Sequence, residues 1–229
     1  MTSHQQNQIK IVEEIESQIK NNSLKFSTVS GVEDFSSDPR ICLTSLHFPS
    51  EALKSLVQER LINPLKTITS EFFYYSDNSL HITIKNVRVI NNPPHFSSND
   101  IKKAKEVFSS VIPSHKKFKV YFYKLLLFPN NLAMIGITEP ELDEIILELD
   151  KKLKRNGIPD DKKYVNSRYF FSNMTLARFN HNPGKEFVDK VSVLSKEIRI
   201  EPYTVDSVSL ITGNAALNNL RVIESWDLK

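Results

Sequence analysis

Cysteine and glycine are both scarce in this chain of 229 residues, which has one cysteine, Cys42, and five glycines. A single cysteine excludes an intrachain disulfide and a metal cluster held by several thiolates, and it fits a reducing compartment. The sequence also lacks an apolar run of about twenty residues, the length that spans a bilayer. The segment 1–8 is polar and has no apolar signal core. We therefore expect a cytoplasmic protein without a membrane partner.

A strong excess of one charge is missing too. The 30 Lys and Arg residues nearly balance the 27 Asp and Glu residues, which leaves a formal charge of +3. This excess alone does not indicate binding to nucleic acid, although it suits an anionic ligand if the basic groups gather in one place. The length and the apolar content of 40% suffice for a sizeable core. The composition therefore predicts one domain, or two tightly joined lobes.

Polar and apolar side chains alternate along the stretch 78–87. Successive side chains of a strand point to opposite faces, so this pattern is typical of a half-buried strand. The apolar face carries Leu80, Ile82 and Ile84. The other face carries His81, Thr83 and Lys85, which are side chains that bind ligands and move protons.

A second stretch, 170–179, has the same form. Asn173 stands where the first stretch has His81, and Thr175 stands where it has Thr83. Tyr169 and Phe171 share the parity of Asn173, and their rings are suited to stack on a nucleobase. Arg178 has the opposite parity to Thr175, so we expect it to leave this face unless a bulge intervenes.

The elements around the two stretches repeat in the same order. The first set consists of a strand over 40–48, a helix that is capped by Ser50 and kinked or divided at Pro64, and the first motif strand. A helix over 99–111 follows this set. The second set repeats this order with a hairpin over 116–137, a helix over 139–156 and the second motif strand. The chain then ends with a helix over 185–195 and strands over 203–212 and 220–228.

This duplication predicts a pseudo-twofold arrangement. The expected fold class is α+β, with two pseudo-symmetric lobes, each a mainly antiparallel sheet with helices on the outside, and a central groove between them. Residues 1–39 are expected to form an N-terminal helix from Ile9 to Lys20 and a connection that includes a short strand near 24–29, packed on a bilobal domain over 40–229.

His81-Ile82-Thr83 and Asn173-Met174-Thr175-Leu176-Ala177-Arg178 resemble the two His-x-Thr motifs of the 2H phosphoesterases. This family includes RNA 2′,5′-ligase-like proteins and 2′,3′-cyclic nucleotide phosphodiesterases, and the resemblance covers roughly 40–228. It implies that the two motifs face each other across a groove. It also implies metal-independent chemistry without a cofactor, in which one histidine takes a proton and the other gives one. The threonines would hold the phosphate oxygens, and Lys85 would add positive charge.

Asn173 departs from the family pattern, because an amide has no useful pKa and cannot act as acid or base. Three explanations remain open: decay to a binding role, replacement of the lost histidine by another residue, or a deliberate inactivating change.

No other histidine is well placed as a replacement. We expect His181 in a surface loop, His47 at a strand end with a local partner, and His4, His95 and His115 in solvent-exposed positions. The basic residues at 151–155 and at 162–163 are interpreted as solvated surface.

The sequence therefore predicts a 2H phosphoesterase-like hydrolase that recognises, and slowly hydrolyses, 2′,3′-cyclic or 2′,5′ phosphodiesters of RNA or nucleotides. The expected catalytic residues are His81, Thr83, Asn173 and Thr175, and the expected substrate-binding residues are Lys85, Tyr169 and Phe171. The expected partner is an RNA end or a nucleotide, and the expected state is a monomer. The alternative is a nucleotide-binding or RNA-end-binding module without turnover.

Overall fold

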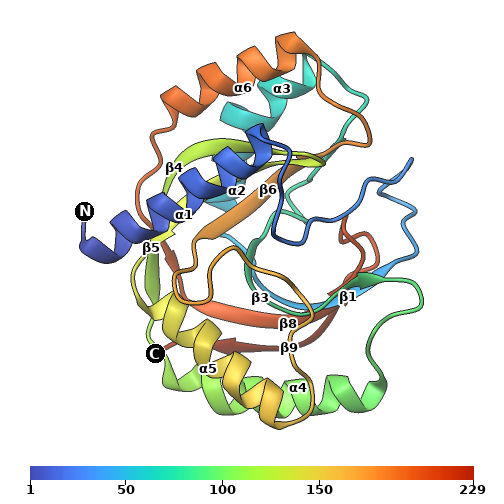
Figure 1. Cartoon of the computed structure of the whole chain (residues 1–229), viewed down its shortest axis with the longest axis vertical. Coiled ribbons are helices and arrows are strands. Elements are labelled where there is room, and N and C mark those ends of the chain that lie inside the picture. The colour runs from blue at the N-terminus through green and yellow to red at the C-terminus, as the bar shows by residue number, and fades with distance from the viewer.

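The computed structural model describes residues 1–229 and is built on one antiparallel sheet of nine strands. The strand order is β7-β4-β5-β6-β3-β1-β8-β9, with β2 paired to β6 (Figure 1). The strands are β1 (Ile41–His47), β2 (Phe73–Tyr74), β3 (Ile82–Asn91), β4 (Phe118–Phe128), β5 (Asn131–Thr138), β6 (Ser172–Arg178), β7 (Tyr203–Val205), β8 (Ser207–Gly213) and β9 (Arg221–Asp227).

The two motif strands lie side by side at the centre of this sheet. Four strands, β7-β4-β5-β6, form one half, and four strands, β3-β1-β8-β9, form the other. The halves meet through β3 and β6, which pair only at Ile82 and Met174. The predicted α+β class with two pseudo-symmetric lobes is confirmed, and the two lobes share one continuous sheet.

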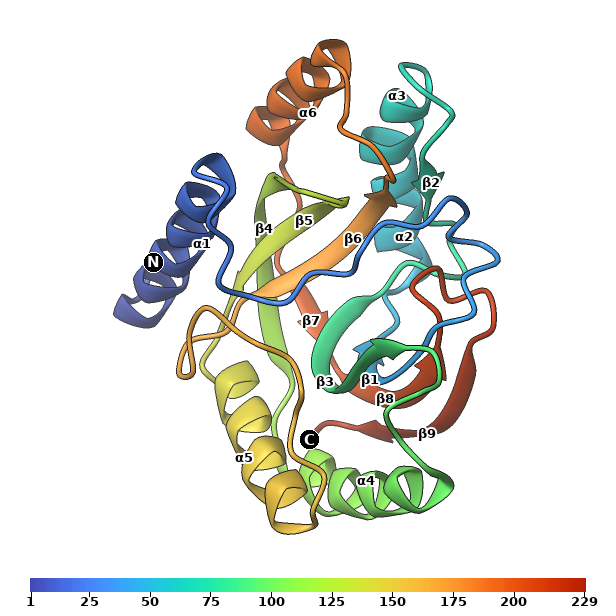
Figure 2. The same ribbon diagram turned by 45° about the vertical axis from the view of Figure 1, so that its right-hand side comes forward.

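Helices cover the outside of both halves. The helices are α1 (Ser3–Lys20), α2 (Glu51–Val57), α3 (Asn63–Lys66), α4 (Ser98–Val111), α5 (Glu141–Arg155) and α6 (Lys185–Glu197). Figure 2 shows α2, α3 and α6 at one end of the molecule and α4 and α5 at the other. The two groups differ in what they touch: α6 packs on β4, while α4 contacts β9 and α5 contacts β3.

Proline and glycine act in the helices as the sequence predicted. Just before Pro64, the helix that begins after Ser50 becomes a π-helical turn over Gln58–Ile62, and α3 follows. Proline lacks an amide donor and collides with the preceding turn, so the regular helix cannot continue through it. Gly157 follows α5 at φ +77°, a conformation that glycine adopts without a steric penalty.

The N-terminal segment differs from the prediction in two respects. Helix α1 begins at Ser3 rather than Ile9, because Thr2 and Gln5 form a capping box. The expected strand near 24–29 is absent; Ser27 bonds instead to the backbone of Lys163 in the segment before β6, with N···O distances of 3.0 and 2.9 Å. Helix α1 packs on β5 through Val12 and Ile15. No helix in the structure has the length and apolar character needed to cross a membrane.

Candidate phosphate-binding site

The single pairing point between β3 and β6 brings the two sequence motifs together. Ile82 and Met174 are partners, and both are buried in the core. In an antiparallel pair, the neighbours of such a point face each other, so His81 lies beside Thr175 and Thr83 lies beside Asn173. All four side chains line the same cavity. The predicted quartet is thus assembled by the fold, with His81 and Asn173 at diagonal corners.

The cavity over this quartet has a volume of about 480 Å³, which is in the size range of small-molecule sites. Its lining contains no Asp or Glu residue. It contains four basic residues, Arg40, Lys162, Lys163 and Arg178. Of these, Arg40 is paired with Asp38 at 2.8 Å. The remaining excess of positive charge favours an anionic ligand.

His81 is buried and held in one orientation. Its Nδ1 donates to the carbonyl oxygen of Ser79 at 2.7 Å. Because a carbonyl can only accept, this bond fixes the tautomer with the proton on Nδ1 and leaves Nε2 as an acceptor. The pKa of His81 is lowered to about 4, chiefly by burial and in part by the charge of Arg178, against the opposing effect of the Ser79 carbonyl. The ring is therefore neutral and able to accept a proton at neutral pH.

This lowered pKa makes stability depend on pH. In the unfolded chain the His81 ring binds a proton near pH 6.5, but in the native chain only near pH 4. Acidification between these values therefore favours the unfolded state, and stability is lost as the pH falls. From about pH 7 to about pH 4.5, we expect the free energy of unfolding to fall by about 2 kcal/mol more in the wild type than in His81→Gln. Urea unfolding of both proteins measures this difference, and equal losses would contradict the burial of a neutral His81.

Arg178 reaches the cavity because a bulge interrupts β6. Ala133 pairs with Thr175 and Leu132 with Ala177, so one extra residue lies in β6 between these pairs. The bulge reverses the alternation of side chains along β6 and turns Arg178 toward the cavity. A bulge is the condition under which Arg178 was expected to stay on this face. Nε of Arg178 donates to the buried hydroxyl of Tyr75 at 2.7 Å, whereas Nη1 is buried without a partner. Because Arg178 lines the cavity, its guanidinium, with an unpartnered nitrogen, can donate to a phosphate oxygen.

Lys85 does not face the cavity, and this prediction was wrong. Leu46 pairs with Thr83 and Ser45 with Lys85, so β3 bulges at Ile84 and Lys85 turns to the other side. Its ammonium group is fully buried and pairs with Asp150 at 2.8 Å and with Asp160. The bulge brings Asn86 to the cavity in place of Lys85.

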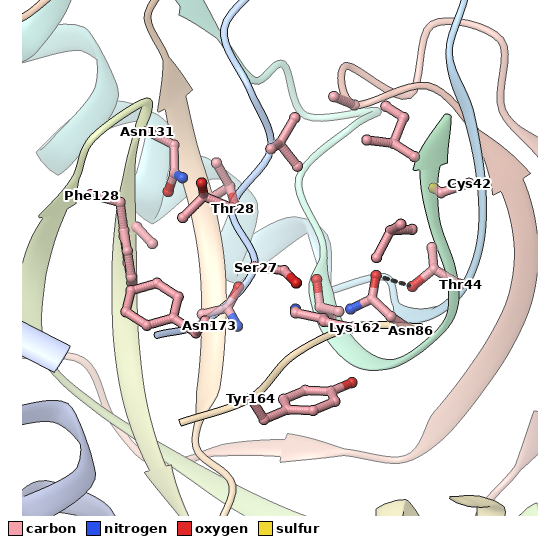
Figure 3. Close-up of a pocket in the computed structure, with 18 of the residues that line it drawn as sticks. Ser27, Thr28, Cys42, Thr44, Asn86, Phe128, Asn131, Lys162, Tyr164 and Asn173 are labelled. Carbon is pink, nitrogen blue, oxygen red and sulfur yellow. Dashed lines mark hydrogen bonds between the residues drawn. The ribbon is translucent and has the colours of Figure 1, made fainter. Parts of the chain in front are cut away.

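The predicted aromatic residues Tyr169 and Phe171 both line the cavity, together with Phe26 and Phe128. Figure 3 shows Phe128 beside Asn173 at one side of the pocket. These rings form an apolar wall next to the quartet, and such a wall suits the flat face of a base.

Lys162 also lines the cavity, contrary to the interpretation of 162–163 as solvated surface. Figure 3 shows its side chain inside the pocket, between Asn173 and Asn86. No local pattern predicts this position, because the segment 156–171 has no periodicity that would fix its path.

The remaining histidines lie outside the cavity. His47 bonds to the Ser207 carbonyl and the Tyr203 hydroxyl, and His95 and His181 are exposed, as predicted. His4 and His115 were expected to be exposed, but His4 is half-buried and His115 buried, and both hydrogen-bond to carboxylates: His4 to Asp143 at 2.7 Å, and His115 to Glu141 and Glu148 of α5. His115, Glu141 and Glu144 are close enough to hold a metal ion, but they lie away from this cavity.

The segment 26–30 forms a further part of the cavity wall that sequence reasoning missed. It follows α1 and passes in front of β6, as Figure 2 shows. The side chain of Asn130 fixes it by donating to the Val29 carbonyl at 2.9 Å. Ser27 and Thr28 thereby line the cavity.

Comparison with solved structures connects this arrangement to a known fold. E. coli LigT in its apo form superposes with a TM-score of 0.54 at 14% identity, over 84% of this chain and 99% of LigT. The complex of E. coli LigT with 3′-AMP gives a TM-score of 0.53 at 14% identity, over 84% of this chain and 99% of that one. The chain has the LigT fold.

A conserved protein of unknown function from Agrobacterium tumefaciens shares this LigT-like fold with a TM-score of 0.61 at 12% identity, over 92% of this chain and 97% of that one. No family model and no curated protein sequence matches the chain. The similarity is therefore one of fold, and the chemistry of the LigT-like groove depends on the residues of this chain.

Proposed function

We propose that this protein recognises a phosphodiester of RNA or of a nucleotide in the groove between β3 and β6, and that it hydrolyses 2′,3′-cyclic or 2′,5′ linkages. The observation that carries this proposal is the quartet of His81, Thr83, Asn173 and Thr175 in a cavity with basic residues and no carboxylate. The site suits an anionic ligand that forms hydrogen bonds with the quartet and carries a base that can stack on the aromatic wall.

The chemistry follows from the free groups of the quartet. Nε2 of His81 accepts a proton from the attacking water, the water oxygen bonds to phosphorus, and the bond from phosphorus to the sugar oxygen breaks as that oxygen takes up a proton. Thr83 and Thr175 line the cavity, so their hydroxyls can donate to non-bridging phosphate oxygens. Nη1 of Arg178 neutralises the charge that develops on these oxygens.

The solved relatives support the anion part of this proposal. E. coli LigT has been solved with phosphate and with 3′-AMP, at TM-scores of 0.52 and 0.53 to this chain. A ligand of this size fits a cavity of about 480 Å³.

A panel of nucleoside 2′,3′-cyclic phosphates and 2′,5′-linked dinucleotides tests the proposal. We expect binding of at least one member, with slow formation of a ring-opened or cleaved product. Absence of both binding and cleavage across the panel would refute the proposed function.

A binding module without turnover is the second candidate, and Asn173 is the observation that favours it. Asn173 can donate to a phosphate oxygen but cannot transfer a proton. Phosphate-dependent binding without product, little changed in His81→Ala, would select this candidate. Hydrolysis that disappears in His81→Ala would exclude it.

Arg178 gives a test of phosphate recognition that does not depend on turnover. A hydrogen bond to a charged group contributes about 1.5–3 kcal/mol, which corresponds to roughly a 10- to 100-fold change in affinity. We expect Arg178→Met to weaken the binding of 3′-AMP by this factor while the binding of adenosine changes little. Isothermal titration calorimetry measures both, and Arg155→Met, at an exposed position on α5, is the control. Equal losses for 3′-AMP and adenosine would contradict the assignment.

A further inference from the structure

Lys162 has a free ammonium group in a place where a charged side chain is usually paired. Its Nζ contacts the face of the Tyr164 ring, at 5.3 Å from the centroid, and forms no ion pair. The nearby carboxylates of Asp160 and Asp150 are both occupied by Lys85. The half-buried Lys162 thus lines the cavity without an ion-pair partner from the chain. A partly desolvated ammonium group without a partner is available to an anionic ligand or to a reaction.

The position of Lys162 matches the corner of the quartet that lacks a titrating group. Asn86 follows Thr83 along β3, away from His81, and Thr83 lies beside Asn173. Lys162 lies between Asn86 and Asn173 in Figure 3. In this view its side chain lies on the side of the pocket that holds Asn173 and Asn86. An acid that serves the leaving oxygen belongs on this side, because the attacking water and the leaving group lie on opposite sides of phosphorus.

We propose that Lys162 is the general acid of this groove and takes the role that Asn173 cannot perform. The inference rests on the proposed function. In the step, His81 Nε2 removes a proton from water, the water oxygen bonds to phosphorus, and the bond from phosphorus to the sugar oxygen breaks. The Lys162 ammonium gives its proton to that oxygen and becomes a neutral amine. The proton held by His81 then returns to Lys162 through solvent, so both groups are restored.

The surroundings of Lys162 favour this role. Burial lowers the pKa of Lys162 to about 8, so the group is mostly protonated at neutral pH and releases its proton more easily than an exposed lysine. Burial is the largest cause of this lowered pKa; the positive charges of Lys85 from β3 and Arg178 from β6 act in the same direction, while Asp160 from the same segment and Cys42 from β1 oppose them. The other groups nearby are Tyr164, and Asp150, Lys151 and Lys154 of α5.

Lys162→Arg separates proton transfer from binding. A guanidinium keeps the positive charge but does not release a proton in proteins. We expect turnover of a 2′,3′-cyclic nucleotide to fall by about 10²- to 10⁴-fold, while the affinity for 3′-AMP changes little. Lys119→Arg, at an exposed position on β4, should leave both quantities unchanged. Turnover near the wild-type level in Lys162→Arg would overturn the inference.

Asn173→His provides the matching rescue. In the Lys162→Arg background it restores a titrating acid, so we expect turnover to recover, whereas in the wild-type background the gain should be small. The loss of kcat/KM at high pH, centred near pH 8 in the wild type, should move toward the ordinary histidine pKa of about 6.5 in the double variant. An equal gain in both backgrounds, or a wild-type profile without a loss near pH 8, would overturn the role of Lys162.

Binding and turnover by the wild type distinguish the role of Lys162 from phosphodiester recognition. A wild type that binds cyclic nucleotides but never turns them over overturns Lys162 as acid and leaves phosphodiester recognition standing. A wild type that binds none of them overturns both.

Discussion

Replacing His81 with alanine should reduce turnover of a 2′,3′-cyclic nucleotide by about 10²- to 10⁴-fold, the usual contribution of a general base. The reason is the fixed tautomer: Nδ1 is committed to the Ser79 carbonyl, so Nε2 is the free proton acceptor of the quartet. Binding of 3′-AMP should weaken far less, because Thr83, Thr175 and Arg178 remain. Steady-state kinetics and calorimetry on the same preparations measure the two effects.

His181→Ala is the matched control, because His181 is exposed and lies outside the cavity. Its turnover should equal that of the wild type. The acid side of the pH profile gives a second check: as the pH is lowered, kcat/KM of the wild type should begin to fall only near pH 4, the pKa of free His81. In kcat this acid limb should lie at higher pH, because a bound anion favours the protonated ring. Retention of more than about a tenth of the turnover in His81→Ala would contradict the base role.

Replacing Lys85 with methionine should destabilise the protein by about 3–5 kcal/mol, the usual cost of breaking a buried ion pair. The substitution leaves Asp160 as a buried carboxylate whose remaining partners are the Tyr164 hydroxyl at 2.8 Å and the Lys162 amide at 2.7 Å. Because these residues belong to the segment that carries Lys162 into the cavity, affinity for 3′-AMP should also fall. Urea unfolding measures the loss of stability.

Two further variants separate this effect from a general loss of charge. Lys54 pairs with exposed Glu51, so Lys54→Met should cost no more than about 1 kcal/mol. Adding Asp160→Asn to Lys85→Met removes the stranded charge and should recover part of the stability. If Lys85→Met is as mild as Lys54→Met, the buried pair does not stabilise this segment.

The sequence was informative where regular periodicity decides the structure. Alternation along 78–87 and 170–179 predicted both motif strands, and the repeated order of elements predicted their meeting in a two-lobed sheet. These predictions hold because strand faces and helix stripes are set by local side-chain spacing. The quartet follows from these strands, since Ile82 and Met174 can only be buried together if their polar neighbours share the opposite face.

Bulges and irregular segments decided the rest of the site. One extra residue in β3 turned Lys85 out of the groove, and one in β6 turned Arg178 into it. Alternation cannot show a bulge, because it depends on the pairing with the neighbouring strand. Lys162 and Ser27 come from segments whose paths are set by long-range bonds, such as that between the Ser27 hydroxyl and the Lys163 amide at 2.9 Å. No local pattern encodes such contacts.

We expect the quartet between β3 and β6 to hold a phosphodiester or its product. A crystal structure of the protein with 3′-AMP tests this expectation most directly. We expect the phosphate between His81 and Asn173, with its oxygens within hydrogen-bond distance of Thr83, Thr175 and Nη1 of Arg178. An empty groove at a saturating concentration of 3′-AMP, or a phosphate bound elsewhere on the protein, would contradict the claim.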